Sequence, residues 1–381
     1  MLPGAGELWA DLDPLVRHCN HGSYGAVPRP VREHRNALQR RAEANPNQWF
    51  RFELPELLER ARLHMADFIG VSADSAAFVR NATTGVNVAL QAVGLREGDE
   101  VIVTDHVYGA VLRTARRATE RVNGTTRIAA IDLVDDVDAH VDAFLSVTND
   151  HTRAAVIDHI ASPTGLVLPV NEIVAALRAR GVVTIVDAAH APGSRELTVS
   201  DIGADFWTGN FHKWLSAPRP CAALAVNDEW RPRTEPLVAS VGLEAGFPTS
   251  FAWQGTDDYT AYLCLEPAVR VLKSFGWETL WRHNDELAAF GGQMVADALG
   301  VEPVLPTTAR GPMTLIPLPD GVITTDLEAR GFIKRVSDAL NVEIAANPFR
   351  GQGYLRLSAH AYNDESDYET LAKGLPGLLA V

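Results

Sequence analysis

The residues best suited to chemistry lie just beyond short apolar runs of the sequence. Asp187 follows the run VVTIV, and Lys213 lies further on in the nearly uncharged stretch GNFHKWLSAP. Lysine is rarely placed among apolar groups without a chemical role, and its unprotonated amine is a nucleophile toward carbonyl carbon. The turn Thr83-Thr84-Gly85 opens a predicted helix, whose free N–H groups suit a phosphate.

An acid at a strand end, a lysine in a later loop and a hydroxyl-rich turn are the parts that hold pyridoxal phosphate in enzymes. The lysine amine forms a Schiff base with the cofactor aldehyde. The carboxylate keeps the pyridine nitrogen protonated, so the ring accepts electrons from a carbanion. Taken alone, an aspartate at a strand end is more often a cap or turn residue, and the Thr-Thr-Gly turn is weak support. The unusual surroundings of Lys213 favour the functional interpretation.

The segments around these residues alternate as in an α/β fold. From about residue 75 to 226, helical stretches separate apolar runs that we interpret as strands: AAFVR, EVIVTD, TRIAAIDL, RAAVIDHI, VVTIVDA and PCAALAV. Residues 182–187 are apolar on both faces apart from Thr184, which is typical of a parallel strand covered on both sides. Apolar residues at helical spacing over 170–177 predict the preceding crossover helix. Ligands bind beyond the carboxyl ends of such strands, which is where Asp187 lies.

Beyond about residue 266 longer helical runs dominate, followed by the strand GYLRLSA and a final helix. We therefore predict an N-terminal segment over 1–20 that packs on the domains, a large cofactor-binding domain over 21–265 and a smaller α+β domain over 266–381. Arg356 lies in the strand of the smaller domain, on the face opposite its two leucine neighbours. Its guanidinium can therefore face a cleft, although without the other motifs an exposed ion pair would be the better explanation.

Composition narrows the class of protein. The 381 residues are 46% apolar and 22% charged, close to globular averages. A net charge of −14 without a basic cluster argues against nucleic-acid and anionic-membrane partners. Three cysteines and no basic, apolar leader indicate the cytoplasm. His18, Cys19 and His21 are metal-ligand types, but no second pair completes a tetrahedral site, so no metal is predicted.

Seven stretches resemble the class V aminotransferase group of fold-type I pyridoxal phosphate enzymes, which includes cysteine desulfurases, and within it the isopenicillin N epimerase-like branch. The similarity extends over nearly the whole chain, and the stretches that carry it are CNHGSYGAVP (19–28), VRNATTGVN (79–87), TDHVYGAV (104–111), DHIASPTGLVLPV (158–170), IVDAAHAPG (185–193), GNFHKWLSAPRP (209–220) and LRLSAHAYN (355–363). The resemblance implies a large domain with a mostly parallel seven-stranded sheet between helices and a smaller α+β C-terminal domain.

The resemblance also implies roles toward the cofactor. Lys213 would be the Schiff-base lysine, Asp187 the partner of the pyridine nitrogen, and His190 a donor to the ring hydroxyl. Tyr108 or His106 would stack on the ring, with Tyr108 preferred because it lies at a helix entry. Further contacts to the ring or phosphate would come from Thr83, Thr84, Ser162, Asn210 and His212.

Other residues would serve the substrate and a second subunit. By resemblance Arg356 clamps the α-carboxylate of an amino-acid substrate, which suits its bidentate geometry. Asn20 and His21 are candidates to line the substrate pocket, although a simple turn explains them nearly as well. Thr256 matches a position that reaches the phosphate of a neighbouring subunit, which implies a homodimer with shared active sites.

The residue types leave the reaction open, because Lys213 can remove the Cα proton in several outcomes. We rank β-elimination from a cysteine S-conjugate first, a C–S lyase reaction of secondary metabolism. Epimerisation of the isopenicillin N epimerase kind, as in antibiotic biosynthesis, decarboxylation-coupled oxidative deamination and a non-catalytic binding protein are the alternatives. The stretch AANPFRGQGY (345–354) lacks the nucleophilic cysteine of desulfurases, so persulfide chemistry is not expected.

Overall fold

The computed structural model describes residues 1–306 and 308–379, and its main element is a seven-stranded sheet. The strand order is β2 (Ala76–Val79), β8 (Ala222–Val226), β7 (Phe206–Asn210), β6 (Val183–Asp187), β5 (Thr152–Asp158), β3 (Glu100–Thr104) and β4 (Thr125–Ala129). Strand β8 pairs antiparallel with both its neighbours, and the other pairs are parallel. The predicted mostly parallel seven-stranded sheet is therefore confirmed.

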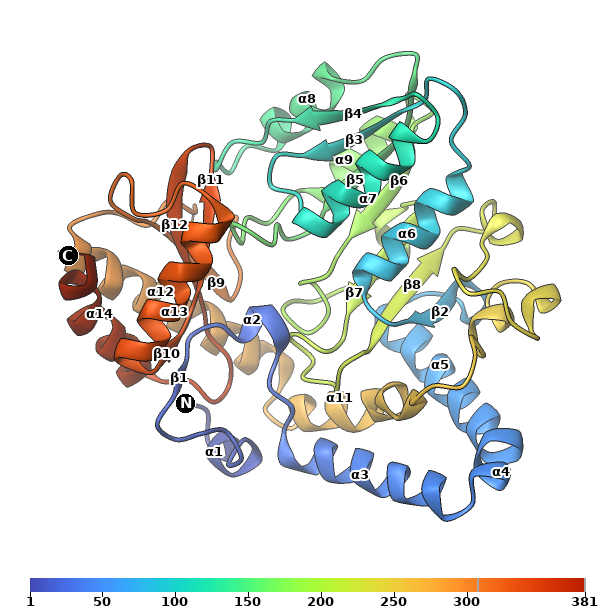
Figure 1. Ribbon diagram of the computed structural model, residues 1–381, viewed down its shortest axis with the longest axis horizontal. Coiled ribbons are helices and arrows are strands. Elements are labelled where there is room, and N and C mark those ends of the chain that lie inside the picture. Colours follow the sequence, from blue (N-terminus) through green and yellow to red (C-terminus); the bar gives the residue numbers. More distant parts are fainter. Residues whose placement is uncertain (307, 380–381) are drawn as a thin grey trace.

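Helices cover both faces of this sheet, so the large part of the molecule has three layers (Figure 1). Val101, Val156 and Ile185 point to one face, which is covered by α6 (Ala82–Val93) and α7 (Gly109–Glu120). The alternate side chains point to the other face, which is covered by α5 (Leu54–Ile69), α8 (Val137–Ser146), α9 (Val170–Arg178) and α11 (Leu265–Lys273). Burial on both faces is why these strands are apolar throughout.

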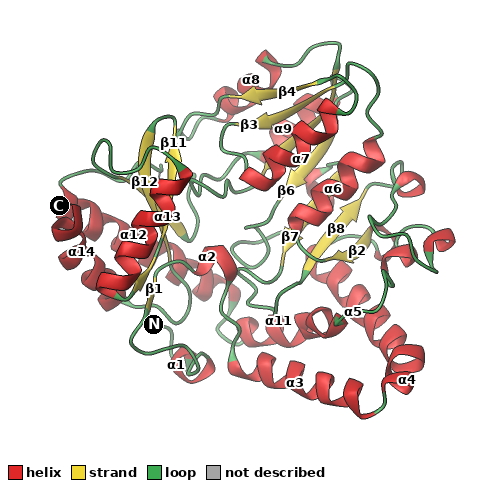
Figure 2. Cartoon of the chain, in the orientation of Figure 1, coloured by secondary structure: helices red, strands yellow, loops and turns green. Residues whose placement is uncertain are grey.

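A smaller antiparallel sheet lies beside the first, as Figure 2 shows. Its order is β11 (Ala345–Phe349), β12 (Gln352–Ser358) and β9 (Met313–Pro317), with the helices α12 (Trp277–Leu299), α13 (Asp326–Leu340) and α14 (Glu365–Leu379) packed around it. Tyr368 of α14 is fully buried and lies so close to Gly291 that a Cβ there would come within 2.3 Å of its ring. The division at residues 265/266 stays a prediction, and α11, which begins there, packs on α3 (Arg29–Ala44) and α5.

The N-terminal segment joins the two sheets. After α1 (Ala5–Leu8), the short strand β1 (Arg17–His18) pairs in parallel with β10 (Val342–Glu343) of the C-terminal part. The next turn, α2 (His21–Tyr24), lies between the two sheets and precedes α3 and α4 (Pro46–Gln48) (Figure 1). Within the large domain, the short helix α10 (Val199–Ile202) precedes β7. Among the described residues, no helix combines the length and the apolar character needed to cross a bilayer.

Candidate active site

Polar side chains end the three central strands on the face that α6 covers. In β6 the side chain of Asp187 has the parity of Ile185, which belongs to the core beneath α6. Asp158 is its register partner at the end of β5, and Asn210 ends β7. The carboxyl ends of parallel strands meet at one sheet edge, so the fold places these groups together with the start of α6.

The first turn of α6 is built for close approach to an anion. The Asn81 side chain accepts from the Thr84 N–H at 2.8 Å, and Asn210 Oδ1 accepts from the Ala82 N–H at 2.9 Å. The N–H and the hydroxyl of Thr83 have no acceptor or donor among the described residues. Gly85 lets the helix lie against the sheet, because a Cβ there would come within 2.1 Å of Thr208 Oγ1. A free N–H at a positive helix end suits a phosphate.

Asp187 is a buried carboxyl that lacks a full complement of partners. Its side chain accepts one hydrogen bond, from the Ala189 N–H at 3.0 Å, and the residue is 4% exposed. Burial raises the pKa of Asp187, against the opposing effects of that N–H and of Lys213. A cation placed over the carboxylate, such as a protonated pyridine nitrogen, would favour its ionised form.

Lys213 follows β7 and meets His190 from the loop after β6. Its Nζ lies 2.9 Å from His190 Nε2. Burial, followed by the nearby charge of Arg356, lowers the pKa of Lys213 to about 7, although Asp187 acts in the opposite direction. A lysine with this pKa is partly an unprotonated amine at neutral pH, as a nucleophile or general base must be.

The second partner of His190 Nε2 is Ser162, whose Oγ lies 3.3 Å away, while Nδ1 accepts from the Trp214 indole at 3.3 Å. Burial and then the charge of Lys213 hold the pKa of His190 well below its ordinary value. The ring is therefore neutral, and its Nε2 contacts Lys213 Nζ and Ser162 Oγ. This position matches its predicted contact to the cofactor ring hydroxyl, which stays a prediction.

Arg356 of β12 presents a buried guanidinium that pairs with no carboxylate among the described residues. It donates to the Ser162 carbonyl oxygen, to Asn20 Oδ1 at 3.2 Å and to Ser23 Oγ at 3.1 Å, while its Nε has no partner. The residue is 3% exposed, and burial lowers its pKa to about 10. A buried cation with neutral partners leaves room for an anion, and a substrate carboxylate supplies one.

Other predicted residues lie around this centre. His212 Nδ1 lies 3.2 Å from the Cys221 oxygen, and burial lowers the pKa of His212 to about 4. Tyr108, before α7, is 48% exposed, whereas His106 is buried with both ring nitrogens engaged by Thr164 Oγ1 and the Ile131 oxygen. The contact of His212 with the phosphate and the stacking of Tyr108 or His106 on the ring stay predictions.

Comparison with known proteins identifies the family. The family model for aminotransferase class-V matches residues 28–371. The chain belongs to the class V aminotransferase family. It is 29% identical to an isopenicillin N epimerase of Amycolatopsis lactamdurans, over 96% of each chain, and 30% identical to a putative L-cysteine desulfhydrase 1 of Oryza sativa subsp. japonica, over 96% of this chain and 83% of the relative.

Solved structures show the same fold. A cystine C-S lyase in complex with cysteine persulfide superposes with a TM-score of 0.83 at 19% identity, covering 96% of this chain and 98% of that one. The predicted fold type I architecture and the resemblance to class V aminotransferases are thus confirmed, and the chain is a pyridoxal phosphate-dependent enzyme. The residues present fit that cofactor: the start of α6 its phosphate, Asp187 its ring nitrogen and Lys213 its aldehyde.

In this class V enzyme, His21 of α2 contacts the backbone of the loop that carries Lys213. His21 Nε2 lies 3.0 Å from the Lys213 carbonyl oxygen and Nδ1 2.9 Å from the Tyr362 hydroxyl, while the ring stacks on His360 at 3.8 Å. With both nitrogens engaged, His21 holds the backbone of Lys213. Its predicted contact with substrate, like that of Asn20, stays a prediction.

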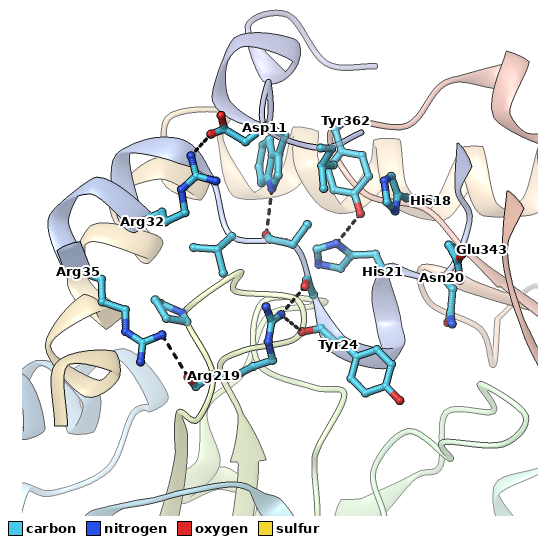
Figure 3. A pocket seen from close by; sticks show the side chains of 16 residues that line it. Asp11, His18, Asn20, His21, Tyr24, Arg32, Arg35, Arg219, Glu343 and Tyr362 are labelled. Carbon is cyan, nitrogen blue, oxygen red and sulfur yellow. Dashed lines mark hydrogen bonds and ion pairs between the residues drawn. The ribbon is translucent and has the colours of Figure 1, made fainter. Parts of the chain in front are cut away.

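A hollow beside α2 is lined by Asn20 and His21, which also contact Arg356 and the backbone of Lys213. Figure 3 shows it between α2, α1 and α3, with a lining that includes Asn20, His21, Tyr24, Arg32, Arg35 and Arg219. Lys213, Asp187 and Arg356 are not part of that lining. Arg219 donates to the carbonyl oxygens of Tyr24 and Gly25 at 2.8 and 2.7 Å, so it fixes the end of α2.

The segment where desulfurases need a cysteine is a tight hairpin. Phe349 of β11 pairs with Gln352 of β12, and the two turn residues Arg350 and Gly351 have φ angles of 48° and 82°. Arg350 donates to Asp105 at 2.8 Å and to Asp132 at 2.7 Å, which ties the turn to the large sheet. This turn carries no thiol.

None of the three cysteines offers a reactive thiolate. Cys19, Cys221 and Cys264 are all buried, and burial raises the pKa of each thiol. Thiolate character is what makes a cysteine nucleophilic. The expectation that this chain lacks the nucleophilic cysteine of desulfurases therefore agrees with their positions.

Three contributors escaped the sequence reasoning. Asp158 satisfies the same strand-end rule as Asp187, so the rule could have found it; its side chain accepts from the Thr104 hydroxyl at 2.6 Å. Ser23 and Trp214 touch Arg356 and His190 respectively. Serine in a turn and tryptophan in an apolar run give no local signal of such contacts.

Proposed function

We propose that this class V enzyme catalyses β-elimination from a cysteine S-conjugate. When bound, pyridoxal phosphate supplies an electron sink for the charge that develops on Cα. Two residues of the chain would act directly: Arg356 would hold the substrate carboxylate, and Lys213 Nζ would take the Cα proton. The electron pair of the C–H bond then forms a Cα=Cβ double bond, and the Cβ–S pair leaves with the thiolate.

The observation that carries this proposal is that burial and the charge of the nearby, buried Arg356 together lower the pKa of Lys213. A buried guanidinium with no carboxylate partner beside an amine of lowered pKa suits an α-amino acid, whose carboxylate and Cα–H are adjacent. The relatives named L-cysteine desulfhydrase support sulfur-containing substrates. The thiol-free turn at Arg350 supports release of the sulfur group rather than its transfer to a cysteine.

A product assay tests the reaction. Purified protein loaded with pyridoxal phosphate is incubated with S-methyl-L-cysteine, and pyruvate, ammonia and thiol are measured together. We expect all three in equal amounts, because the unsaturated product hydrolyses to pyruvate and ammonia. The Lys213→Ala variant should release none and should lose the visible absorbance of the bound cofactor. A mixture that contains only the D-epimer would contradict elimination.

Epimerisation is the second candidate, favoured by the 29% identity to an isopenicillin N epimerase over 96% of both chains. That reaction needs a proton returned to the opposite face of Cα, and Tyr108, half exposed at the start of α7, is a residue able to donate it. Incubation in D₂O separates the two reactions. Deuterium at Cα of recovered substrate without pyruvate would indicate epimerisation.

We also propose a homodimer with shared active sites. Thr256 is exposed in the loop 253–258, beside Asp257, which pairs with Arg80 at the end of β2. An exposed hydroxyl next to a strand end of the large sheet is available to a second subunit. The neighbouring segment also exposes Leu237, Val238 and Val241, apolar side chains that an interface would cover.

A further inference from the structure

Trp214 lies directly after Lys213, is fully buried and has no part in the proposed reaction. Its indole Nε1 donates a hydrogen bond to His190 Nδ1 at 3.3 Å. An indole N–H can donate but never accept, so His190 Nδ1 must offer its lone pair and carry no proton. The proton of the neutral imidazole is then on Nε2.

The position of that proton decides the state of Lys213. His190 Nε2 lies 2.9 Å from Lys213 Nζ. An ammonium group cannot accept a hydrogen bond, whereas an unprotonated amine accepts one from an N–H. With Nε2 acting as donor, its 2.9 Å contact with Nζ, which is shorter than its 3.3 Å contact with Ser162 Oγ, is satisfied only by the unprotonated amine. A His190 with the other tautomer would instead accept from the ammonium and stabilise it.

We propose that Trp214 is a positioning residue whose indole fixes His190 in the Nε2–H tautomer, and that this tautomer holds the Lys213 amine unprotonated and ready to attack the cofactor aldehyde. The attack forms a C=N bond between Nζ and the aldehyde carbon and releases the aldehyde oxygen as water. It needs the free electron pair of the amine. This inference rests on the proposed role of Lys213 in holding the cofactor.

The charged groups around Lys213 do not produce this selection themselves. Arg356 on β12 disfavours the ammonium form, Asp187 on β6 favours it, and His212, the preceding residue, has a lowered pKa and is neutral at neutral pH. The effects of Arg356 and Asp187 on the pKa of Lys213 depend on their distance and charge, not on the tautomer of His190. Comparing the loss of the indole at Trp214 with the same substitution at another buried tryptophan therefore separates the hydrogen-bond effect from burial and charge.

The tautomer can be measured on the full chain without cofactor. Nitrogen-15 NMR of histidine-labelled wild-type protein, with the His190 signals assigned from His190→Gln, should show a protonated Nε2 and an unprotonated Nδ1 near neutral pH. In Trp214→Phe, which keeps an aromatic ring but lacks the donor, the preference for Nε2–H should be lost. A wild-type His190 that is protonated on Nδ1 would overturn the proposal, and this result does not depend on how the variant folds.

The second measurement follows the rate of covalent attachment of pyridoxal phosphate as a function of pH, read from visible absorbance and from protein mass after borohydride reduction. We expect the midpoint for Trp214→Phe to rise by about one pH unit, with attachment at pH 7 about fivefold slower. Trp207→Phe is the matched control, because Trp207 is equally buried in β7 and its indole N–H has no acceptor among the described residues.

The outcomes separate this inference from the proposed function. No shift in Trp214→Phe, or an equal shift in Trp207→Phe, overturns the role of the indole. If the wild-type protein attaches no cofactor while Lys213→Ala behaves identically, the proposed function fails. The NMR result then still decides whether Trp214 sets the tautomer of His190.

Discussion

Arg356 is the residue whose surroundings most directly describe a ligand. Its guanidinium is buried, its Nε is unpaired, and its polar partners are all uncharged. Leaving a buried cation without an anion is costly, so folding retains this arrangement only where a ligand or a strong local demand compensates. The α-carboxylate of an amino acid is the anion we propose here, because it would place the Cα proton near Lys213.

Replacing Arg356 by alanine should weaken substrate binding strongly. One charge-assisted, desolvated contact is worth roughly 2 to 5 kcal/mol, so we expect KM to rise by about 30-fold or more while the cofactor absorbance stays. Steady-state kinetics with S-methyl-L-cysteine measures the change. Arg356→Lys serves as the control, since it keeps the charge but loses the planar fork; an unaltered KM in Arg356→Ala would contradict the clamp.

Among single residues, the sequence was sufficient to select those that are marked by their residue type and by a position just after a predicted strand. Asp187, Lys213 and His190 are brought together as the motifs implied. Trp214 could not be found, because its function depends on the direction of one N–H toward a residue 24 positions away. Ser23 was hidden for the same reason, since its contact to Arg356 joins opposite ends of the chain.

At the scale of the elements, the pairing of β5 with β6 places a second buried carboxyl, that of Asp158, next to Asp187. Asp158 and Asp187 are register partners on adjacent parallel strands, and both side chains face α6. Burial, followed by the charge of Asp187, raises the pKa of Asp158 to about 7, and the Thr104 hydroxyl on the next strand opposes this only in part. At neutral pH Asp158 is therefore about half protonated, and below about pH 6 it is largely protonated.

This arrangement predicts a pH-dependent difference in stability. The folded pKa of Asp158 lies above its unfolded value, so the folded state binds the proton more tightly and the contribution of Asp158 to stability falls as pH rises from about 4 to 7. Asp158→Asn mimics the protonated carboxyl and removes that fall. Relative to wild type, the variant should gain up to about 4 kcal/mol between pH 4 and pH 8.

Urea unfolding of both proteins without cofactor, at the two pH values, measures this difference. Titrating histidines and Lys213 affect wild type and variant alike, so they cancel in the comparison. Asp142→Asn is a control, because Asp142 lies on α8 away from the central strand ends. A difference between Asp158→Asn and wild type that does not change with pH would show that Asp158 is ionised throughout.

The elements themselves were predictable where periodicity was strong. The six apolar runs correspond to six strands, and the stripe over 170–177 is the buried face of α9. Strand β7 was not among those runs, because its second half, Thr208, Gly209 and Asn210, is not apolar. These residues are buried, and they allow close packing against α6 and contact with its first turn. The pairing of β1 with β10 left no local pattern, since it joins residues more than 300 positions apart.

At the scale of the whole molecule, shared sites predict complementation between two inactive variants. Thr256→Glu should be inactive because its carboxylate would repel the partner's phosphate, and Lys213→Ala lacks the reacting amine. In a mixed dimer one site carries both defects and the other carries neither. Random mixing should restore about a quarter of wild-type activity.

Mixing after mild dissociation and re-association, followed by the pyruvate assay, measures this recovery, and light scattering should give twice the chain mass of 41.3 kDa. Mixing Lys213→Ala with Arg356→Ala supplies a comparison, because both residues come from the same chain in this structure. Each site of that mixed dimer then carries one defect, so no activity should be recovered. A monomer in solution at assay concentration would contradict the shared site.

The turn at Arg350 and Gly351 has one more consequence. If the proposed elimination takes place, the thiolate released beside Lys213 meets no cysteine on this hairpin, which is short and held by Asp105 and Asp132. The thiolate would leave the site as a small molecule and diffuse into the surrounding solution. Accepting proteins would then compete for it by concentration rather than by docking.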